Sequence, residues 1–180
     1  MIRLVIASLI FLCLFSCNNQ PTLEKQYVKL INSHIMIPEN LPFTINGKDT
    51  MITDFHKKRM KCIMYMDSTV CNVCNLNKLV DWIPLIEEYK RTNSIAFYFI
   101  FVPPKNEVTE MNHITKELQL NYPIIIDTLN TFKQHNRDIT YNKYLNVFLL
   151  DKNRIIFIGN PLYDAQLNLL FHKKVQDCLE

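Results

Sequence analysis

Short apolar segments alternate with amphipathic segments along most of the chain from Lys61 onward. Apolar runs of a few residues between polar positions are typical of buried strands, and apolar residues three or four positions apart are typical of helices that cover a sheet. The regular alternation of the two indicates βαβ units around a buried, partly parallel sheet. We therefore predict an α/β fold with a central mixed sheet flanked by helices.

Three apolar runs are predicted to form the inner strands, at Cys62–Met66, Ile95–Val102 and Tyr122–Asp127. The second run is apolar on both faces, as expected for a strand that helices cover on each side, and we place it at the centre of the sheet. Pro123 lies at the start of the third run, where a missing backbone donor is tolerated.

Two hairpins are predicted at the ends of this arrangement. Leu145–Leu150 and Arg154–Ile158 are joined by a tight polar turn and are expected to close the sheet. Ile35–Asp54 contains short apolar pieces interrupted by two prolines and a glycine, and we expect an irregular lead-in hairpin there.

Helices are predicted at Asn75–Tyr89, Glu107–Leu120, Thr128–His135 and Leu162–Leu179. Because Pro84 removes a backbone donor inside the first of them, we expect one helix with a kink near Val80–Ile83 rather than two separate helices. The last helix closes the fold, and its apolar residues available to pack on the sheet are Leu167, Leu170, Phe171 and Val175.

The amino terminus has the layout of a secretory signal: Arg3 is followed by an apolar run from Leu4 to Phe15 that is too short to span a bilayer. Leu14-Phe15-Ser16-Cys17 resembles the lipobox of bacterial lipoproteins, which implies cleavage before Cys17 and attachment of lipid there. The predicted organisation is a signal peptide over residues 1–16, a lipidated cysteine and tether with a short helix over 17–34, and one domain over 35–180. We expect the protein in the cell envelope, anchored to a membrane and facing the periplasm.

Composition excludes several classes of ligand. The 180 residues are 48% hydrophobic with a net charge of +3, and the basic residues are scattered, so nucleic acid is not expected as a partner. Gly47 and Gly159 are the only glycines, which rules out glycine-rich phosphate-binding loops. The histidines are dispersed, and no second C-x-x-C pair is present to complete a four-thiolate zinc site, so we predict neither a metal nor a cofactor.

Four thiols remain once the signal is removed and Cys17 is lipidated: Cys62, Cys71, Cys74 and Cys178. Export places them where disulfide chemistry is possible. We expect Cys62 to be a small buried core residue and Cys178 to be a free thiol near the chain end, although a disulfide between these two is a further option. The remaining pair forms the motif Cys71-Asn72-Val73-Cys74.

The position of this C-x-x-C motif, between a buried strand and the first turn of a helix, suits redox chemistry. Free backbone N–H groups at a helix start stabilise a thiolate, which lowers the pKa of the first cysteine and makes it a nucleophile. The two-residue spacer lets the second cysteine reach back to the first. We therefore expect Cys71 to attack a partner disulfide and Cys74 to resolve the mixed disulfide.

The order of elements around this motif resembles the thioredoxin-like superfamily, and within it the secreted, membrane-tethered oxidoreductases related to TlpA and ResA. The strings MDSTVCNVCNL, Phe148–Lys152 and Ile158–Pro161 also resemble small thioredoxin-like lipoproteins of Bacteroidetes. Three positions depart from the family pattern. Val70 replaces the usual tryptophan, Leu145 lies where a cis-proline is usual, and Tyr65 occupies the position of a buried carboxylate that accepts a proton from the resolving cysteine.

Asp67 is the acidic residue nearest to that missing carboxylate. It is a candidate catalytic base, and the alternative is an ordinary turn or helix cap at the end of a strand.

Two functions follow from these observations. The first is a thiol-disulfide oxidoreductase that acts as a monomer on the thiols and disulfides of envelope proteins. The second is a non-catalytic thioredoxin-like binding module whose cysteines form a structural clip, a reading favoured by the missing tryptophan and cis-proline. A peroxidase of the peroxiredoxin type is disfavoured, because the pattern Pro-x-x-x-Thr-x-x-Cys is absent.

Overall fold

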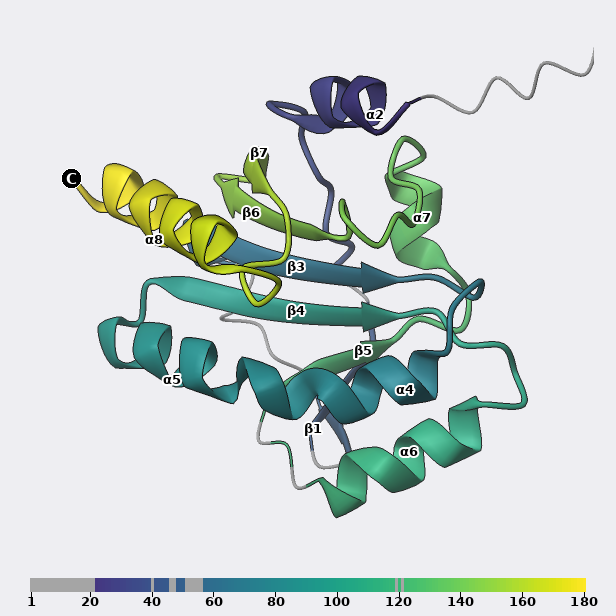
Figure 1. Ribbon diagram of the computed structural model, residues 1–180. Helices are drawn as coiled ribbons and strands as arrows, with labels where there is room; N and C mark the ends of the chain where they lie inside the picture. Colours follow the sequence, from purple (N-terminus) through teal and green to yellow (C-terminus); the bar gives the residue numbers. More distant parts are fainter. Residues whose placement is uncertain (1–21, 40, 46–47, 51–56, 119, 121) are drawn as a thin grey trace, which may run out of the picture.

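The computed structural model describes residues 22–39, 41–45, 48–50, 57–118, 120 and 122–180 (Figure 1). The signal segment, Cys17 and the end of the predicted lead-in hairpin at 51–54 lie outside these residues. None of the helices in the described part of the chain is long and apolar enough to cross a membrane.

The described residues form a seven-stranded mixed sheet in the order β2-β1-β5-β4-β3-β6-β7. β4 is the middle strand, as predicted, and it pairs in parallel with β3 and β5, while all other pairs are antiparallel. The strands are β1 (Phe43–Ile45), β2 (Lys48–Thr50), β3 (Met60–Met66), β4 (Ile95–Phe101), β5 (Ile124–Ile126), β6 (Val147–Asp151) and β7 (Arg154–Ile158).

Helices cover both faces of this sheet (Figure 1). One apolar core lies under α4, η1, α5, α6 and α8, and a second lies on the opposite face under α2 and α7. The helical segments are α2 (Leu23–Leu30), α4 (Asn72–Asn77), the 3₁₀ helix η1 (Lys78–Trp82), α5 (Ile83–Thr92), α6 (Val108–Glu117), α7 (Thr131–His135) and α8 (Ala165–Leu179). The predicted α/β class, with a closing hairpin and a carboxy-terminal helix, is confirmed.

β3 and β4 form the buried centre of the fold. They pair over their full length, from Met60 opposite Ile95 to Met66 opposite Phe101, and every residue of both strands is buried. Alternate residues of β3 enter the two cores, with Met64 and Met66 on the α4 side and Tyr65 on the α7 side. This burial on both faces explains why the two segments are almost continuously apolar.

The predicted kinked helix corresponds to three consecutive segments. α4 begins three residues earlier than expected, at Asn72, and the 3₁₀ helix η1 begins at Lys78, two residues before the predicted kink near Val80–Ile83, and covers most of that region. Pro84 lies in the first turn of α5, where its missing N–H leaves no helical hydrogen bond unmade. The position of the irregularity is therefore confirmed, but the interruption is a full 3₁₀ segment.

One packing prediction for the last helix is wrong. Phe171 and Val175, four residues apart, are buried against the sheet, and Leu167 packs at their edge. Leu170 is instead 43% exposed, because it precedes Phe171 by one position and so lies about 100° round the helix from the buried stripe.

The strands of both predicted hairpins pair among the described residues. β6 and β7 are joined by Lys152 and Asn153, which both adopt the left-handed conformation of a tight turn. β1 and β2 pair as the lead-in hairpin, and β1 also pairs with β5, so this hairpin extends the sheet by two strands.

Candidate active site

Cys71 and Cys74 form a disulfide at the carboxy-terminal edge of β3, with their Cα atoms 5.3 Å apart. Both residues are exposed to solvent. Because β3 and β4 are parallel, the loop that carries Cys71 and the residues that follow β4 meet at the same edge of the sheet. The site therefore has a rigid base of two fully buried strands.

Cys71 is the N-cap residue of α4. Its Sγ accepts a hydrogen bond from the backbone N–H of Cys74 at 3.1 Å. Its carbonyl oxygen accepts two more from Asn75, one from the backbone N–H at 3.2 Å and one from the side-chain amide at 2.8 Å. A backbone donor aimed at this sulfur would stabilise a thiolate in the reduced protein.

Asn72, the first residue between the two cysteines, is fully buried although it is polar. Its side-chain Nδ2 donates to the carbonyl oxygens of Asp67 at 3.0 Å, Val70 at 3.2 Å and Val102 at 3.4 Å. These carbonyls belong to the residue after β3, the loop before Cys71 and the residue after β4. One amide therefore ties the cysteine loop to the ends of both central strands, a contact that the sequence analysis did not identify.

Asp67 makes a turn immediately before the cysteines. Its Oδ1 accepts hydrogen bonds from the backbone N–H of Thr69 at 2.9 Å and from the Thr69 hydroxyl. This is the turn-capping arrangement that was the alternative to a catalytic role. It leaves the carboxylate partly exposed.

Tyr65, which occupies the position where the resemblance implies a buried carboxylate, has its side chain turned away from the disulfide. Tyr65 points into the core opposite α4, where its ring packs on Phe132 with centroids 5.4 Å apart and its hydroxyl donates to Asn130 Oδ1 at 3.4 Å. Burial raises the pKa of the Tyr65 phenol, so it stays protonated at neutral pH. Tyr65 therefore supplies no proton acceptor to the cysteines.

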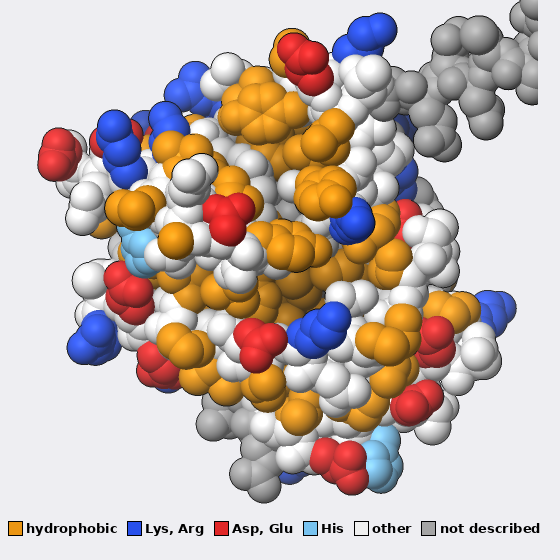
Figure 2. Space-filling model, viewed as in Figure 1, with side chains coloured by type: hydrophobic (Ala, Val, Ile, Leu, Met, Phe, Trp, Pro, Cys, Tyr) orange, Lys and Arg blue, Asp and Glu red, His pale blue; other side chains and the backbone are white. Residues whose placement is uncertain are grey.

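A cavity of about 210 Å³ lies beside the helix that carries the cysteines. Met64 and Met66 of β3 contribute to its lining, together with Asn75 of α4 and Asn146, which precedes β6. Asn146 is 3% exposed; its amide donates to Met66 Sδ at 3.5 Å, and its Oδ1 has no partner among the described residues. Figure 2 shows hydrophobic side chains around a hollow on this face, between the start of α8 and the helices α4 and α5.

Tyrosines surround the same region. Tyr144 and Tyr163 are more than half exposed, with ring centroids 6.5 Å apart, and Tyr141 lines the cavity with Tyr163. Burial, followed by the charges of Tyr163 and Asp67, raises the pKa of Tyr141. These tyrosines were not predicted from the sequence, because they lie in an irregular segment and just before a helix, where no periodic pattern marks them.

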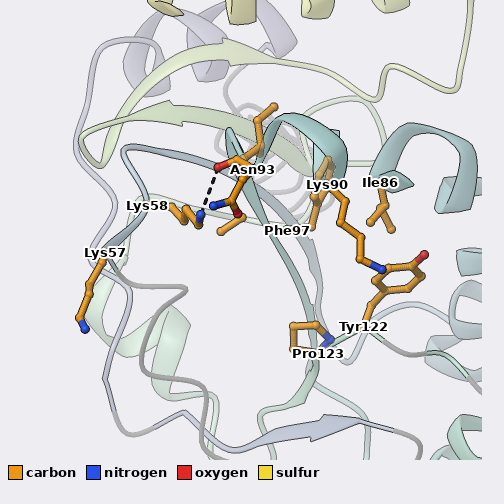
Figure 3. A pocket seen from close by; sticks show the side chains of 10 residues that line it. Lys57, Lys58, Ile86, Lys90, Asn93, Phe97, Tyr122 and Pro123 are labelled. Carbon is orange, nitrogen blue, oxygen red and sulfur yellow. Dashed lines mark hydrogen bonds between the residues drawn. The ribbon is translucent and has the colours of Figure 1, made fainter. Parts of the chain in front are cut away.

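A larger cavity, about 610 Å³, lies at the end of the central strands opposite to the disulfide, where β4 begins (Figure 3). It is lined by the start of β4 and the end of α5, with Lys58 donating to the Asn93 carbonyl at 3.1 Å and Lys90 placed over the Tyr122 ring. Since Cys71 follows the other end of β3, this cavity is separate from the disulfide.

The other two thiols are not redox partners in this structure. Cys62 is buried in β3, Cys178 is partly buried in α8, and both are unpaired, so the disulfide considered between them is not formed. Burial raises the pKa of both thiols. The described residues also contain no group of three or more histidine, cysteine or acidic side chains placed to hold a metal ion.

The known proteins that this chain resembles are similar to it in structure and not in sequence. No protein-family model matches the chain, and no curated protein matches its sequence. Among solved structures, a thioredoxin-like protein in its oxidised form has a TM-score of 0.54 at 13% identity, covering 83% of this chain and 98% of its own. The carboxy-terminal domain of a putative thiol-disulfide oxidoreductase from Bacteroides thetaiotaomicron also has a TM-score of 0.54, at 14% identity, covering 82% and 97%.

A peroxiredoxin-related structure, AhpC from Mycobacterium tuberculosis, has a TM-score of 0.50 at 16% identity and covers 80% of this chain and 97% of its own. At such identities the likeness concerns the backbone arrangement and not the reaction. This chain has a thioredoxin-like fold.

Proposed function

We propose that this protein is a thiol-disulfide oxidoreductase of the bacterial cell envelope, anchored through lipid on Cys17 and facing the periplasm. The observation that carries the proposal is the exposed Cys71–Cys74 disulfide at the start of α4, with Cys71 Sγ accepting the Cys74 N–H. Its substrates are the thiols and disulfides of other envelope proteins, and it acts as a monomer. Two proteins of similar fold, a thioredoxin-like protein in its oxidised form and a domain of a putative thiol-disulfide oxidoreductase, support this assignment.

The proposed reaction exchanges two electrons. In the reduced protein, the Cys71 thiolate attacks a client disulfide, so a Cys71–client bond forms and the second client sulfur leaves as a thiolate. The Cys74 thiolate then attacks Cys71 Sγ, which forms the disulfide seen in the structure and releases the first client sulfur. The client gains two electrons, and a dithiol reductant of the envelope then reduces the Cys71–Cys74 disulfide again by giving up two electrons of its own and becoming a disulfide.

Three observations favour the second candidate, a binding module with a structural clip. Val70 and Leu145 lie at the positions of the usual tryptophan and cis-proline, and the Tyr65 phenol faces away from the cysteines. Such a module would keep its partner without either thiol. Mutation of the cysteines therefore separates the two functions.

The first prediction concerns mixed disulfides. In a Cys62→Ser/Cys178→Ser background, Cys74→Ser is expected to hold client proteins through Cys71, because the resolving thiol is missing. Mass spectrometry after thiol quenching should identify conjugates that dithiothreitol releases. The matched control is Cys71→Ser/Cys74→Ser in the same background, which should hold none. Equal capture by both variants would refute the enzyme and favour the binding module.

The second prediction concerns Asn72 as a positioning residue. Asn72→Ala leaves three buried or half-buried carbonyls without their donor and is expected to lower the free energy of unfolding by about 2–3 kcal/mol. It should also slow closure of the Cys71–Cys74 disulfide from a mixed disulfide with a model peptide, because the cysteine loop is no longer fixed to β3 and β4.

The control for Asn72 is Asn77→Ala. The Asn77 amide donates to the Val73 carbonyl on the exposed side of the same helix, at 3.2 Å. This change should alter the unfolding free energy by no more than about 0.5 kcal/mol, as is usual for exposed positions, and leave the closure rate unchanged. If Asn72→Ala closes its disulfide as fast as Asn77→Ala, Asn72 has no positioning role.

The third prediction concerns Asp67, which we propose as the proton acceptor of the Cys74 thiol. Asp67→Asn keeps an oxygen for the Thr69 N–H and removes the charge. The resolving step should slow about tenfold or more at neutral pH. The loss should shrink as the pH rises past the ordinary thiol pKa of about 8.5, because the thiolate then forms without a base.

Stopped-flow measurement of resolution between pH 6 and 9 tests the role of Asp67, with Asp81→Asn as the control for loss of a nearby exposed carboxylate. If Asp67→Asn resolves the mixed disulfide as fast as the wild-type protein at every pH, Asp67 is not the proton acceptor and only caps the turn.

A further inference from the structure

Asn146 is a buried polar side chain in the wall of the cavity beside the cysteines. Its backbone is fixed, because its carbonyl oxygen accepts the Tyr65 N–H at 2.9 Å. Its side-chain amide donates to Met66 Sδ at 3.5 Å, and its Oδ1 has no partner among the described residues. A thioether is a weak acceptor, and a buried carbonyl oxygen without a donor costs free energy. The side chain is therefore weakly held and carries an acceptor that a ligand can satisfy.

The cavity lies about one helical turn from the reactive cysteine. Asn75, which also lines it, directly follows Cys74, and its side-chain amide donates to the Cys71 carbonyl at 2.8 Å. The four helical steps from Cys71 to Asn75 correspond to a rise of about 6 Å, which an extended peptide covers in about two residues. A client whose sulfur meets Cys71 therefore reaches the cavity with a residue about two positions from its own cysteine.

The size and the walls of the cavity fit one aromatic side chain. Its volume of about 210 Å³ is below the roughly 300–1,000 Å³ of pockets that take drug-sized ligands. Met64, Met66 and Trp82 supply apolar walls, and all three are buried. Methionine sulfur and aromatic rings both make favourable contacts with another aromatic ring.

Exposed aromatic and apolar side chains extend these walls to the surface. Leu162 and Tyr163, which follow β7, line the cavity and are exposed, and Tyr144 lies beside Tyr163. Figure 2 shows hydrophobic side chains around the hollow on this face. Tyrosine offers a large contact area at a low cost in conformational entropy, which is why it is frequent where proteins bind one another. This rim gives the main chain of a client a surface on which to lie.

The charge distribution of the cavity selects a neutral donor. Its charged lining residues, Lys78 and Asp81, are both exposed, and the described lining residues that are buried carry no charge. A cation that entered would lose its hydration without a buried carboxylate to pair with. Tyrosine and tryptophan instead have an apolar ring with one O–H or N–H at the far end, which needs an acceptor when it is buried.

Asn146 can present such an acceptor. Its Oδ1 has almost no exposed surface in the free protein, so the amide must turn to meet an incoming donor. The terminal torsion of asparagine is broad, and the turn gives up the weak contact with Met66 Sδ for a hydrogen bond to a true donor. Binding of the correct side chain thus removes the unpaired buried oxygen.

We infer that this cavity is a specificity pocket for the client, which takes a tyrosine or tryptophan side chain about two residues from the client's reactive cysteine and binds its O–H or N–H through Asn146 Oδ1. The inference rests on the proposed oxidoreductase function and names the clients with which the pair reacts fastest. The bound ring holds the client sulfur against Cys71, so the pocket acts on the first exchange step.

The test compares peptides that differ in one residue. Each has a cysteine in a disulfide with thionitrobenzoate, and tyrosine, phenylalanine or alanine two positions before that cysteine in one set and two positions after it in another. When Cys71 attacks the peptide sulfur, a Cys71–peptide bond forms and thionitrobenzoate leaves as a coloured thiolate, because its pKa is low. In a Cys62→Ser/Cys178→Ser background, the reduced full protein should release it from the tyrosine peptide of one set about five- to tenfold faster than from the phenylalanine peptide, as expected for one hydrogen bond.

Asn146→Leu replaces the acceptor by an apolar side chain and should abolish the preference for tyrosine over phenylalanine. The matched control is Asn77→Leu, the same change at an exposed position of α4, which should keep the preference. Equal release from the tyrosine and phenylalanine peptides in both sets, measured with Asn146 intact, would overturn the inference and leave the oxidoreductase standing, as would an unchanged preference in Asn146→Leu. Release no faster than from Cys71→Ser/Cys74→Ser would instead contradict the proposed function itself.

Discussion

The parallel pairing of β3 and β4 is the constraint on which the rest of the structure depends. A parallel pair that is buried on both faces needs helices on each side, and the chain supplies α4, α5 and α8 on one face and α7 on the other. Because the two strands run in the same direction, they end at one edge. The residues after each strand can then be joined by a single side chain, Asn72, which donates to the carbonyls of Asp67 and Val102.

This arrangement divides the site into rigid and exposed parts. The buried amide of Asn72 fixes the loop, while Cys71 and Cys74 are exposed to solvent. Cys62 is buried and Cys178 is partly buried, and burial raises the pKa of both thiols. Of the four cysteines among the described residues, Cys71 and Cys74 form the disulfide and are exposed, while Cys62 and Cys178 are unpaired.

Much of the fold could be predicted because it rests on periodic burial. The apolar runs at β3 and β4 identify the buried inner strands and place β4 at the centre of the sheet, and Pro84 marks the irregular helix. Leu170 was misplaced because a run of leucines does not define which face of α8 is buried. The burial of Asn72 and Asn146 was not predicted, because their amides contact groups that are distant in sequence, the Val102 carbonyl for Asn72 and Met66 Sδ for Asn146, and such contacts leave no local pattern in the sequence.

The central claim is that Cys71 and Cys74 form a reversible redox pair and not a permanent structural disulfide. The most direct measurement is an equilibrium redox titration of the full protein in glutathione and dithiothreitol buffers, with alkylation of free thiols and mass analysis. The account predicts one two-electron transition confined to this pair, at a potential between about −120 and −270 mV, the range of thioredoxin-like oxidoreductases. A pair that stays oxidised below about −300 mV, as structural disulfides do, would contradict it.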